Sequence, residues 1–245
     1  MKLLQRVGST SPTAPLTVIC LPHAGGGTAS FAQAMPALNG LADVWCALLP
    51  GRENRMLTPS VCTMKETVAA LSEDLLKLDE RPIVLLACSF GGWISHALIA
   101  SMSLELSHKI RACVLCGSKP PHLPQDVSLS SLPSHMMLRA TEARVGSVND
   151  LNRLSATVIR SLVVALRNDL VVAESYRPAP QPLNFMHTLI YMGIHDLYAA
   201  SYADRWVDLF PAMQPIRWFE SGHFLFRSSS SALTLQLRSD LLSLL

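Results

Sequence analysis

The stretch Ile-Val-Leu-Leu-Ala-Cys-Ser-Phe-Gly-Gly-Trp, residues 83–93, decides the fold. An apolar run stops at Ser89, and two glycines follow at once. This order is typical of a buried strand, a sharp turn that presents one hydroxyl, and a helix. The pattern for such a turn is Gly-x-Ser-x-Gly, and Ala87, the smallest step from glycine, holds its first position. The stretch predicts that Ser89 is a nucleophile; an ordinary strand-to-helix turn that contains a serine is the alternative.

The rest of the chain alternates apolar runs with helical patterns. Short continuous apolar runs indicate strands that are buried on both faces. Their alternation with helices predicts an α/β fold with a mostly parallel central sheet and helices on both faces. We expect strands at residues 16–22, 44–49, 83–88, 112–116, 188–192 and 216–219. We expect helices at residues 64–78, 92–102, 199–210 and 229–244.

One long stretch, residues 120–182, breaks this alternation. Prolines open and close it, and its middle carries apolar residues at three- and four-residue intervals from Leu151 to Leu170. A structureless loop of this length is uncommon, so we expect a helical lid inserted into one domain that spans residues 1–245. Basic residues recur there at every seventh position, which fits either a solvated helix face or a docking surface for an acidic partner. They are Arg153, Arg160 and Arg167.

The composition argues against several classes of protein. The 245 residues are 49% hydrophobic and 16% charged, with a formal net charge of +2 and no basic block interleaved with aromatics, so we expect no nucleic-acid partner. The apolar run at residues 16–21 is too short to span a bilayer, and no export signal pattern precedes it. We therefore expect a cytoplasmic protein without a membrane partner. Cys113 and Cys116 have a metal-like spacing, but they would point to opposite faces of a strand, so we expect no metal and reduced thiols.

A serine hydroxyl becomes a nucleophile when a histidine takes its proton and an acid orients that histidine. His223 follows the last expected strand, and a loop there reaches the carboxyl edge of the sheet, where open α/β sheets bind their ligands. Asp196 follows the preceding strand and is the only carboxylate near the end of that strand. We expect Ser89, Asp196 and His223 to form a catalytic triad, with His195 as the alternative base.

Acyl transfer also needs two backbone N–H groups that point at the developing oxyanion. One would come from Phe90, directly after the nucleophile. The other would come from the loop Pro-His-Ala-Gly-Gly-Gly, residues 22–27, where successive glycines let the backbone approach a substrate. We expect Ala24 to be this second donor, with Gly25 as the alternative. We assign His23 to the same loop.

Several segments together resemble the type II thioesterases of polyketide and nonribosomal peptide assembly lines, a family with the α/β-hydrolase fold. The shared segments lie in the family's order at residues 21–26, 49–55, around Ser89, 166–169 and 221–224. The segment Leu-Pro-Gly-Arg-Glu at residues 49–53 is the most specific, because general esterases lack it. The family's turn usually reads Gly-His-Ser-Met-Gly, so Cys88 and Phe90 change the walls beside the nucleophile.

The resemblance implies hydrolysis of acyl or aminoacyl groups from the phosphopantetheine arms of acyl or peptidyl carrier proteins, without a cofactor. It also implies a helical lid over an acyl chamber. The candidate substrate-binding residues are His23, Gly25, Arg52, Met136 and Met137. An ion pair near the mouth of the chamber is the alternative role for Arg52 and Glu53, and packing within the lid is the alternative for the two methionines. We expect a monomer.

Three other functions fit the same residues. A general carboxylesterase or lipase would use the triad on oxygen esters, and an acyl-transfer enzyme would resolve the acyl-enzyme with a nucleophile other than water. A non-catalytic binding module that keeps the fold is the third, because fold alone does not establish activity.

Overall fold

The computed structural model describes residues 2–8, 13–58, 63–124, 127–146, 155–185, 187–227 and 231–245. Within them, seven strands form one sheet in the order β1-β3-β2-β4-β5-β6-β7. Only the pairing of β1 with β3 is antiparallel; the other neighbours are parallel. The strands are β1 (Leu4–Arg6), β2 (Leu16–Leu21), β3 (Ala42–Ala47), β4 (Ile83–Cys88), β5 (Ile110–Cys116), β6 (Thr188–Gly193) and β7 (Arg217–Phe219).

The central strands are buried on both faces, which explains their continuous apolar sequences. Successive side chains of β2 point to opposite sides, with Ile19 in one buried cluster and Cys20 in the other. Cys113 and Cys116 of β5 are divided between the same two clusters, as the alternation predicted. Ala87 of β4 pairs with both neighbouring strands, so the three strands end close to one another at the edge where Ser89 follows.

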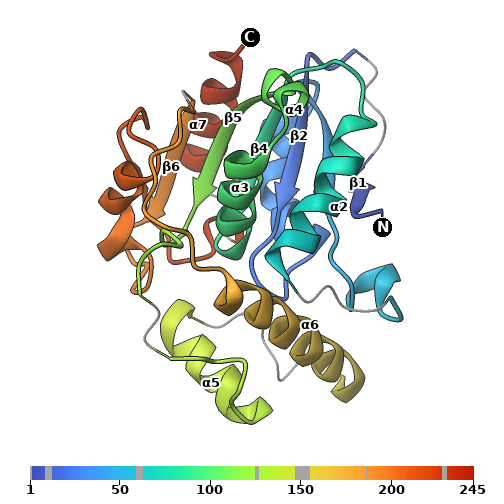
Figure 1. The fold of residues 1–245 in the computed structure, drawn as a ribbon, viewed down its shortest axis with the longest axis vertical. Helices are drawn as coiled ribbons and strands as arrows, with labels where there is room; N and C mark the ends of the chain where they lie inside the picture. The colour runs from blue at the N-terminus through green and yellow to red at the C-terminus, as the bar shows by residue number, and fades with distance from the viewer. Residues whose placement is uncertain are drawn as a thin grey trace.

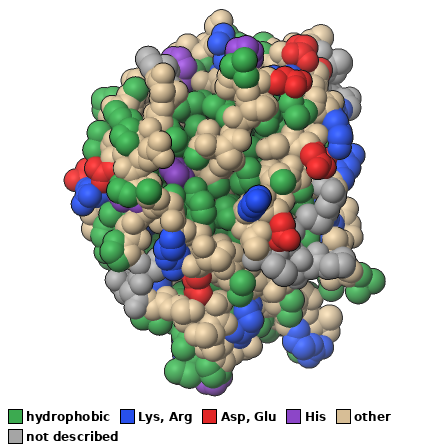
Figure 2. Space-filling model, viewed as in Figure 1, with side chains coloured by type: hydrophobic (Ala, Val, Ile, Leu, Met, Phe, Trp, Pro, Cys, Tyr) green, Lys and Arg blue, Asp and Glu red, His purple; other side chains and the backbone are tan. Residues whose placement is uncertain are grey.

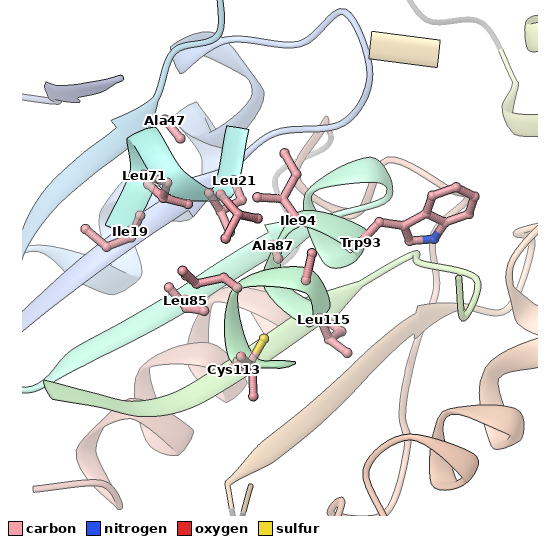
Figure 3. Packing of buried hydrophobic residues seen from close by; sticks show 14 of the residues in the cluster. Ile19, Leu21, Ala47, Leu71, Leu85, Ala87, Trp93, Ile94, Cys113 and Leu115 are labelled. Carbon is pink, nitrogen blue, oxygen red and sulfur yellow. The ribbon is translucent and has the colours of Figure 1, made fainter. Parts of the chain in front are cut away.

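Three helices cover one face of the sheet: α2 (Met64–Leu76), α3 (Phe90–Ser101) and α4 (Leu104–Lys109). Ile94 of α3 lies among Leu21, Ala87 and Leu115 from three neighbouring strands, as Figure 3 shows. α2 begins with a capping box: the Thr63 hydroxyl accepts from the Glu66 N–H, and the Glu66 carboxylate accepts from the Thr63 N–H. These helices hold the start of α3, and with it the turn at Ser89, against the sheet.

The opposite face is covered by the chain's early and late segments. These are the 3₁₀ helix η1 (Thr28–Ala34), α1 (Met35–Leu38) and α7 (Ser231–Leu242), which lies behind the sheet in Figure 1. Further 3₁₀ helices are η2 (Glu53–Arg55), η4 (Ala200–Asp208) and η5 (Leu225–Arg227).

The described part of the long segment between β5 and β6 contains the helices α5 (Ser134–Val145) and α6 (Ala156–Ser175). They lie beyond the carboxyl ends of the strands, below the sheet in Figure 1. α6 begins where the Ser155 hydroxyl accepts the Val158 N–H. Arg167 of α6 donates to the carbonyls of Ser130 and Leu132, and so attaches the segment that leads into α5.

These hydrogen bonds bear on the three arginines that recur at every seventh position, Arg153, Arg160 and Arg167. Arg167 is engaged within the inserted segment, and Arg160 contacts Thr157 on its own helix. Arg153 lies outside the described residues, as do Leu151 and Leu154 of the predicted apolar face. The row therefore gives no continuous docking surface on the described helix.

Several predicted boundaries differ from those observed. The α-helix predicted at residues 199–210 is instead the 3₁₀ helix η4 (Ala200–Asp208), and β1 and α4 were not predicted. Figure 2 shows basic and acidic side chains scattered singly over one face, without a block of one sign. Among the described residues, no helix combines the length and the apolarity that crossing a bilayer requires.

Candidate active site

The turn after β4 holds Ser89 in a strained backbone conformation, with φ of 50° and ψ of −111°. Non-glycine residues rarely adopt a positive φ, and such strain gathers at functional sites. The Ser89 N–H donates to the Cys116 carbonyl at 2.9 Å, and the Ser89 carbonyl accepts from the Ser118 hydroxyl at 2.8 Å. The backbone of the turn is thus fixed by the end of β5.

Two glycines make this turn possible. A Cβ atom on Gly91 would collide with the Leu21 carbonyl of β2, and one on Gly92 would collide with the Ser118 hydroxyl. α3 can therefore start directly against the sheet only with glycine at these positions.

Three side chains from distant segments form a hydrogen-bonded row. The Ser89 Oγ lies 2.9 Å from Nε2 of His223, and Nδ1 of His223 lies 2.9 Å from Oδ2 of Asp196. A carboxylate can only accept, so Nδ1 donates to Asp196 and Nε2 is left to accept from Ser89. His223 and Asp196 are 5% and 4% exposed, which shields these hydrogen bonds from water.

The surroundings of Asp196 favour the ionised form of its carboxyl group. Burial raises the pKa of its carboxyl group, but the His223 ring and the N–H groups of Ala199 and Tyr198 outweigh burial and hold that pKa below its usual value. Asp196 therefore favours a protonated imidazole beside it.

His195, the alternative base, lies elsewhere. Its side chain is exposed, and its Nε2 lies 2.5 Å from Oε1 of Glu220. The structure brings His223, and not His195, to the Ser89 hydroxyl.

Two backbone N–H groups lie beside the row with no hydrogen-bond partner among the described residues. They belong to Phe90, the first residue of α3, and Ala24, in the loop after β2; both residues line the same cavity as Ser89. The N–H of Gly25 donates to Oδ2 of Asp169 at 2.7 Å. Because that N–H is already engaged, the geometry favours Ala24 over Gly25 as the second donor to an oxyanion.

The Gly25 bond belongs to a buried ion pair. The Arg52 guanidinium donates to both carboxylate oxygens of Asp169, at 2.8 and 2.6 Å, and to the Gly26 carbonyl at 2.8 Å. This bidentate pair connects the glycine loop, the loop after β3 and helix α6.

These contacts place Arg52 in an ion pair, which was the alternative to its predicted role in substrate binding. Its partner is Asp169, which the sequence did not indicate. Arg52 is 6% exposed and lines neither of the two cavities described below, because its donors are directed at Asp169. Glu53 accepts from the N–H and hydroxyl of Thr28 instead of pairing with Arg52.

His23 lies next to the row without joining it. Its Nδ1 lies 3.0 Å from the Ala24 carbonyl, its Nε2 lies 3.2 Å from the Ser30 hydroxyl, and its ring packs on Phe224. Burial lowers the pKa of His23 to about 4, so the ring is neutral near pH 7.

Two cavities meet at Ser89. The inner cavity, of about 100 Å³, lies between α3 and the inserted helices and is lined mainly by apolar side chains such as Trp93, Leu166 and Leu170. The outer cavity, of about 480 Å³, is lined by residues 25–27, Val158 and Leu162, among others. Both are also lined by His23, Ser89, His223 and Phe224.

Met136 and Met137, two of the candidate substrate-binding residues, line neither of these cavities. Met137 is fully buried against Leu129 and Leu166, and Met136, on the other side of the helix turn, is 47% exposed. Packing within the insertion, the alternative prediction, describes Met137. Gly25 lines only the outer cavity.

The sequence interpretation missed residues whose partners are far away along the chain. Tyr198 packs edge-on against His223 with ring centroids 6.0 Å apart, and Arg144 lines the inner cavity. Asp169 was visible only as part of the shared segment at residues 166–169.

The sheet order, the serine turn after β4, and the aspartate and histidine after β6 and β7 define an α/β-hydrolase. The type II thioesterase BorB from the borrelidin biosynthetic cluster has the same fold, with a TM-score of 0.81 over 98% of this chain and 97% of BorB at 22% identity.

The chain belongs to the thioesterase domain family, whose model matches residues 16–239. A probable cadicidin biosynthesis thioesterase of Streptomyces griseus is 26% identical over 238 residues, covering 91% of this chain and 62% of that protein. The AMB antimetabolite synthetase AmbE of Pseudomonas aeruginosa is 31% identical over 192 residues, covering 76% of this chain and 9% of AmbE. The matches thus span less than two thirds of these two relatives.

Proposed function

We propose that this chain is a serine thioesterase that hydrolyses acyl or aminoacyl thioesters from the phosphopantetheine arms of carrier proteins. One observation carries the proposal: the Ser89 hydroxyl, hydrogen-bonded to His223, lies where two cavities of a thioesterase-family chain meet. In this proposal, the inner cavity holds the acyl group and the outer cavity holds the arm.

The reaction proceeds in two steps. His223 Nε2 takes the Ser89 proton while Oγ attacks the thioester carbonyl, and Asp196 stabilises the imidazolium that forms. The N–H groups of Ala24 and Phe90 donate to the tetrahedral oxyanion. The C–S bond then breaks, and the thiol leaves with the proton from His223.

Water completes the cycle. His223 takes a proton from a water molecule that attacks the acyl-enzyme carbonyl. The second tetrahedral intermediate collapses, the carboxylic acid leaves, and Ser89 Oγ regains its proton from His223. These steps need no metal or redox cofactor.

The partner and the lid are parts of the same proposal. The Streptomyces griseus relative is named for cadicidin biosynthesis and the Pseudomonas aeruginosa relative is named an antimetabolite synthetase, which supports carrier proteins as partners. Residues 120–182 would act as a lid on a single domain, because α5 and α6 lie beyond the ends of the strands that carry Ser89, Asp196 and His223. A cytoplasmic location and a monomeric state remain predictions.

The test compares matched substrates. Acyl groups loaded on a carrier protein through phosphopantetheine are incubated with the wild-type protein and with Ser89→Ala, beside oxygen esters of the same acyl groups. We expect Ser89-dependent release of free acid from the thioester in clear preference to the ester. Equal turnover of the oxygen ester would favour a general esterase, and an acylated product of unexpected mass would favour acyl transfer. Equal turnover by wild type and Ser89→Ala on every substrate would leave a non-catalytic module as the best account.

A further inference from the structure

The inner cavity holds three charged side chains in a wall that is otherwise mostly apolar: Lys119, Arg144 and Glu174. A charge in such surroundings is unfavourable unless a partner compensates it. The way in which each charge is compensated therefore indicates what the cavity can bind.

Glu174 is compensated by the chain itself. Its carboxylate accepts from the hydroxyls of Ser128 and Ser130 and from the N–H groups of Leu129 and Ser130. Burial raises the pKa of Glu174, but these four hydrogen bonds outweigh burial and hold the pKa below its usual value. Glu174 is thus a fixed anion that fastens the loop before α5.

Lys119 is also engaged by the protein. Its ammonium donates to the Pro124 carbonyl at 2.7 Å and lies 4.3 Å from the centroid of the Tyr202 ring. A carbonyl and an aromatic face together stabilise a buried ammonium.

Arg144, in the last turn of α5, differs from both. Its side chain is partly buried, and its guanidinium carbon lies 5.9 Å from the centroid of the Tyr198 ring. Within the part of the chain that the structure describes, no hydrogen bond or ion pair reaches this guanidinium. Tyr198 also packs against His223, so the guanidinium is separated from the imidazole by one aromatic ring.

A guanidinium offers a planar fork of five N–H donors, which matches the two oxygens of a carboxylate. Among the described residues, Arg144 is the cation of this cavity wall that has no hydrogen-bond or ion-pair partner, so it favours a ligand that brings an anion. The cavity has a volume of about 100 Å³, which accommodates a short acyl group. The geometry points to an acyl group that carries a carboxylate at the end remote from the thioester, a dicarboxylic acid half-thioester, with Arg144 as the residue that binds this carboxylate. This inference rests on the proposed thioesterase function and names its substrate class.

The test uses two acyl thioesters of N-acetylcysteamine, a thiol that resembles the end of the arm. Succinyl and butyryl groups have the same chain and differ in a terminal carboxylate against a methyl group. Arg144→Gln removes the charge from the cavity wall. Arg139→Gln is the matched control, because Arg139 lies on the same helix, is exposed, and lines neither cavity. The Ser89→Ala variant measures the uncatalysed background.

For the wild type, we expect kcat/KM to be at least about tenfold higher for succinyl than for butyryl, as a hydrogen-bonded charge pair provides. Arg144→Gln should lower kcat/KM for succinyl to about the butyryl value and leave the butyryl value unchanged. Arg139→Gln should preserve the wild-type preference for succinyl. An equal ratio in wild type and Arg144→Gln, with Ser89-dependent butyryl hydrolysis intact, would overturn the inference and leave the proposed function standing. A fall of both rates together would assign Arg144 a structural role at the end of α5 and would also overturn it. Turnover of both substrates by Ser89→Ala at the wild-type rate would remove the proposed function and this inference with it.

Discussion

At the scale of single residues, Ser89 and His223 share one proton and should act as a unit. Ser89→Ala removes the nucleophile and His223→Ala removes the base, so each should lower kcat/KM by roughly 10³- to 10⁶-fold. Asp196→Asn should cost less, about 10²- to 10⁴-fold, because the base remains but its orientation and its charged form are poorly supported. Hydrolysis of an acyl N-acetylcysteamine thioester measures all three variants.

The matched control for the base is His195→Ala. His195 is exposed and contacts Glu220, so its removal should leave kcat/KM close to the wild-type value. A large loss in His195→Ala together with activity in His223→Ala would transfer the role of base to His195. Circular dichroism of each variant verifies that the fold is retained.

Residues were predictable where the signal is local or ordered along the chain. The turn at Ser89 is a continuous pattern, and Asp196 and His223 follow from the order of strands and loops. The partner of Arg52 was not predictable in this way, because Asp169 is 117 positions away and only packing brings the two together. Arg144 shows the same limit, because its place on the cavity wall beside Tyr198 depends on the packing of α5 against a distant segment.

At the scale of elements, the pair of Arg52 and Asp169 should stabilise the glycine loop against α6. Removing one partner, in Arg52→Met or Asp169→Leu, leaves a buried charge uncompensated and should lower the free energy of unfolding by about 3–5 kcal/mol. The double variant should lose less than either single variant, because no isolated charge remains. Urea unfolding measures the four proteins, and additive losses would contradict this account.

A second link between elements predicts the response to acid. His96 of α3 lies 2.8 Å from the Tyr176 hydroxyl at the end of α6, and burial, followed by the charge of His122, lowers the pKa of His96 to about 4. The unfolded chain takes up this proton near pH 6.5, so the folded state binds fewer protons between these values. The contribution to stability is therefore full above pH 6.5 and is lost as the pH falls towards 4, on the order of 3 kcal/mol for this group. His23 acts in the same direction.

His96→Phe should flatten this dependence, because a ring of similar shape no longer takes up a proton in the unfolded chain. Urea unfolding at several pH values from 4.5 to 7.5 gives the slope. His108→Gln is the control, since His108 lies on the surface, and it should leave the slope unchanged. An unchanged slope in His96→Phe would show that other groups dominate the response to acid.

The elements that the sequence predicted are those with long periodic patterns. β1 has three residues and α4 has six, too few for a period to be read. The segment at residues 199–210 has a helical pattern, but the N–H groups of Tyr198 and Ala199 are held by Asp196 and the segment forms the 3₁₀ helix η4. These contacts at the start of the segment join residues two and three positions apart, and an apolar period does not reveal them.

At the scale of the whole molecule, the inserted helix α6 lines both cavities that meet at Ser89. Leu166, Leu170 and Ala173 line the inner cavity, and Val158 and Leu162 line the outer one. The proline boundaries and apolar spacing indicated that a helical insertion exists, but not which of its side chains line each space. That information depends on how α6 is placed against α2, α3 and the glycine loop.

This division of α6 predicts two different effects of the same substitution. Leu170→Ala enlarges the inner cavity and should raise kcat/KM for hexanoyl relative to butyryl thioesters, by roughly tenfold if the cavity accepts two more methylenes at about 0.8 kcal/mol each. Leu162→Ala, in the outer cavity, removes the same atoms and should leave this ratio unchanged. Ratios within one series of N-acetylcysteamine thioesters cancel general effects on the triad. If Leu162→Ala shifted the ratio and Leu170→Ala did not, the acyl group would lie in the outer cavity and the arm in the inner one.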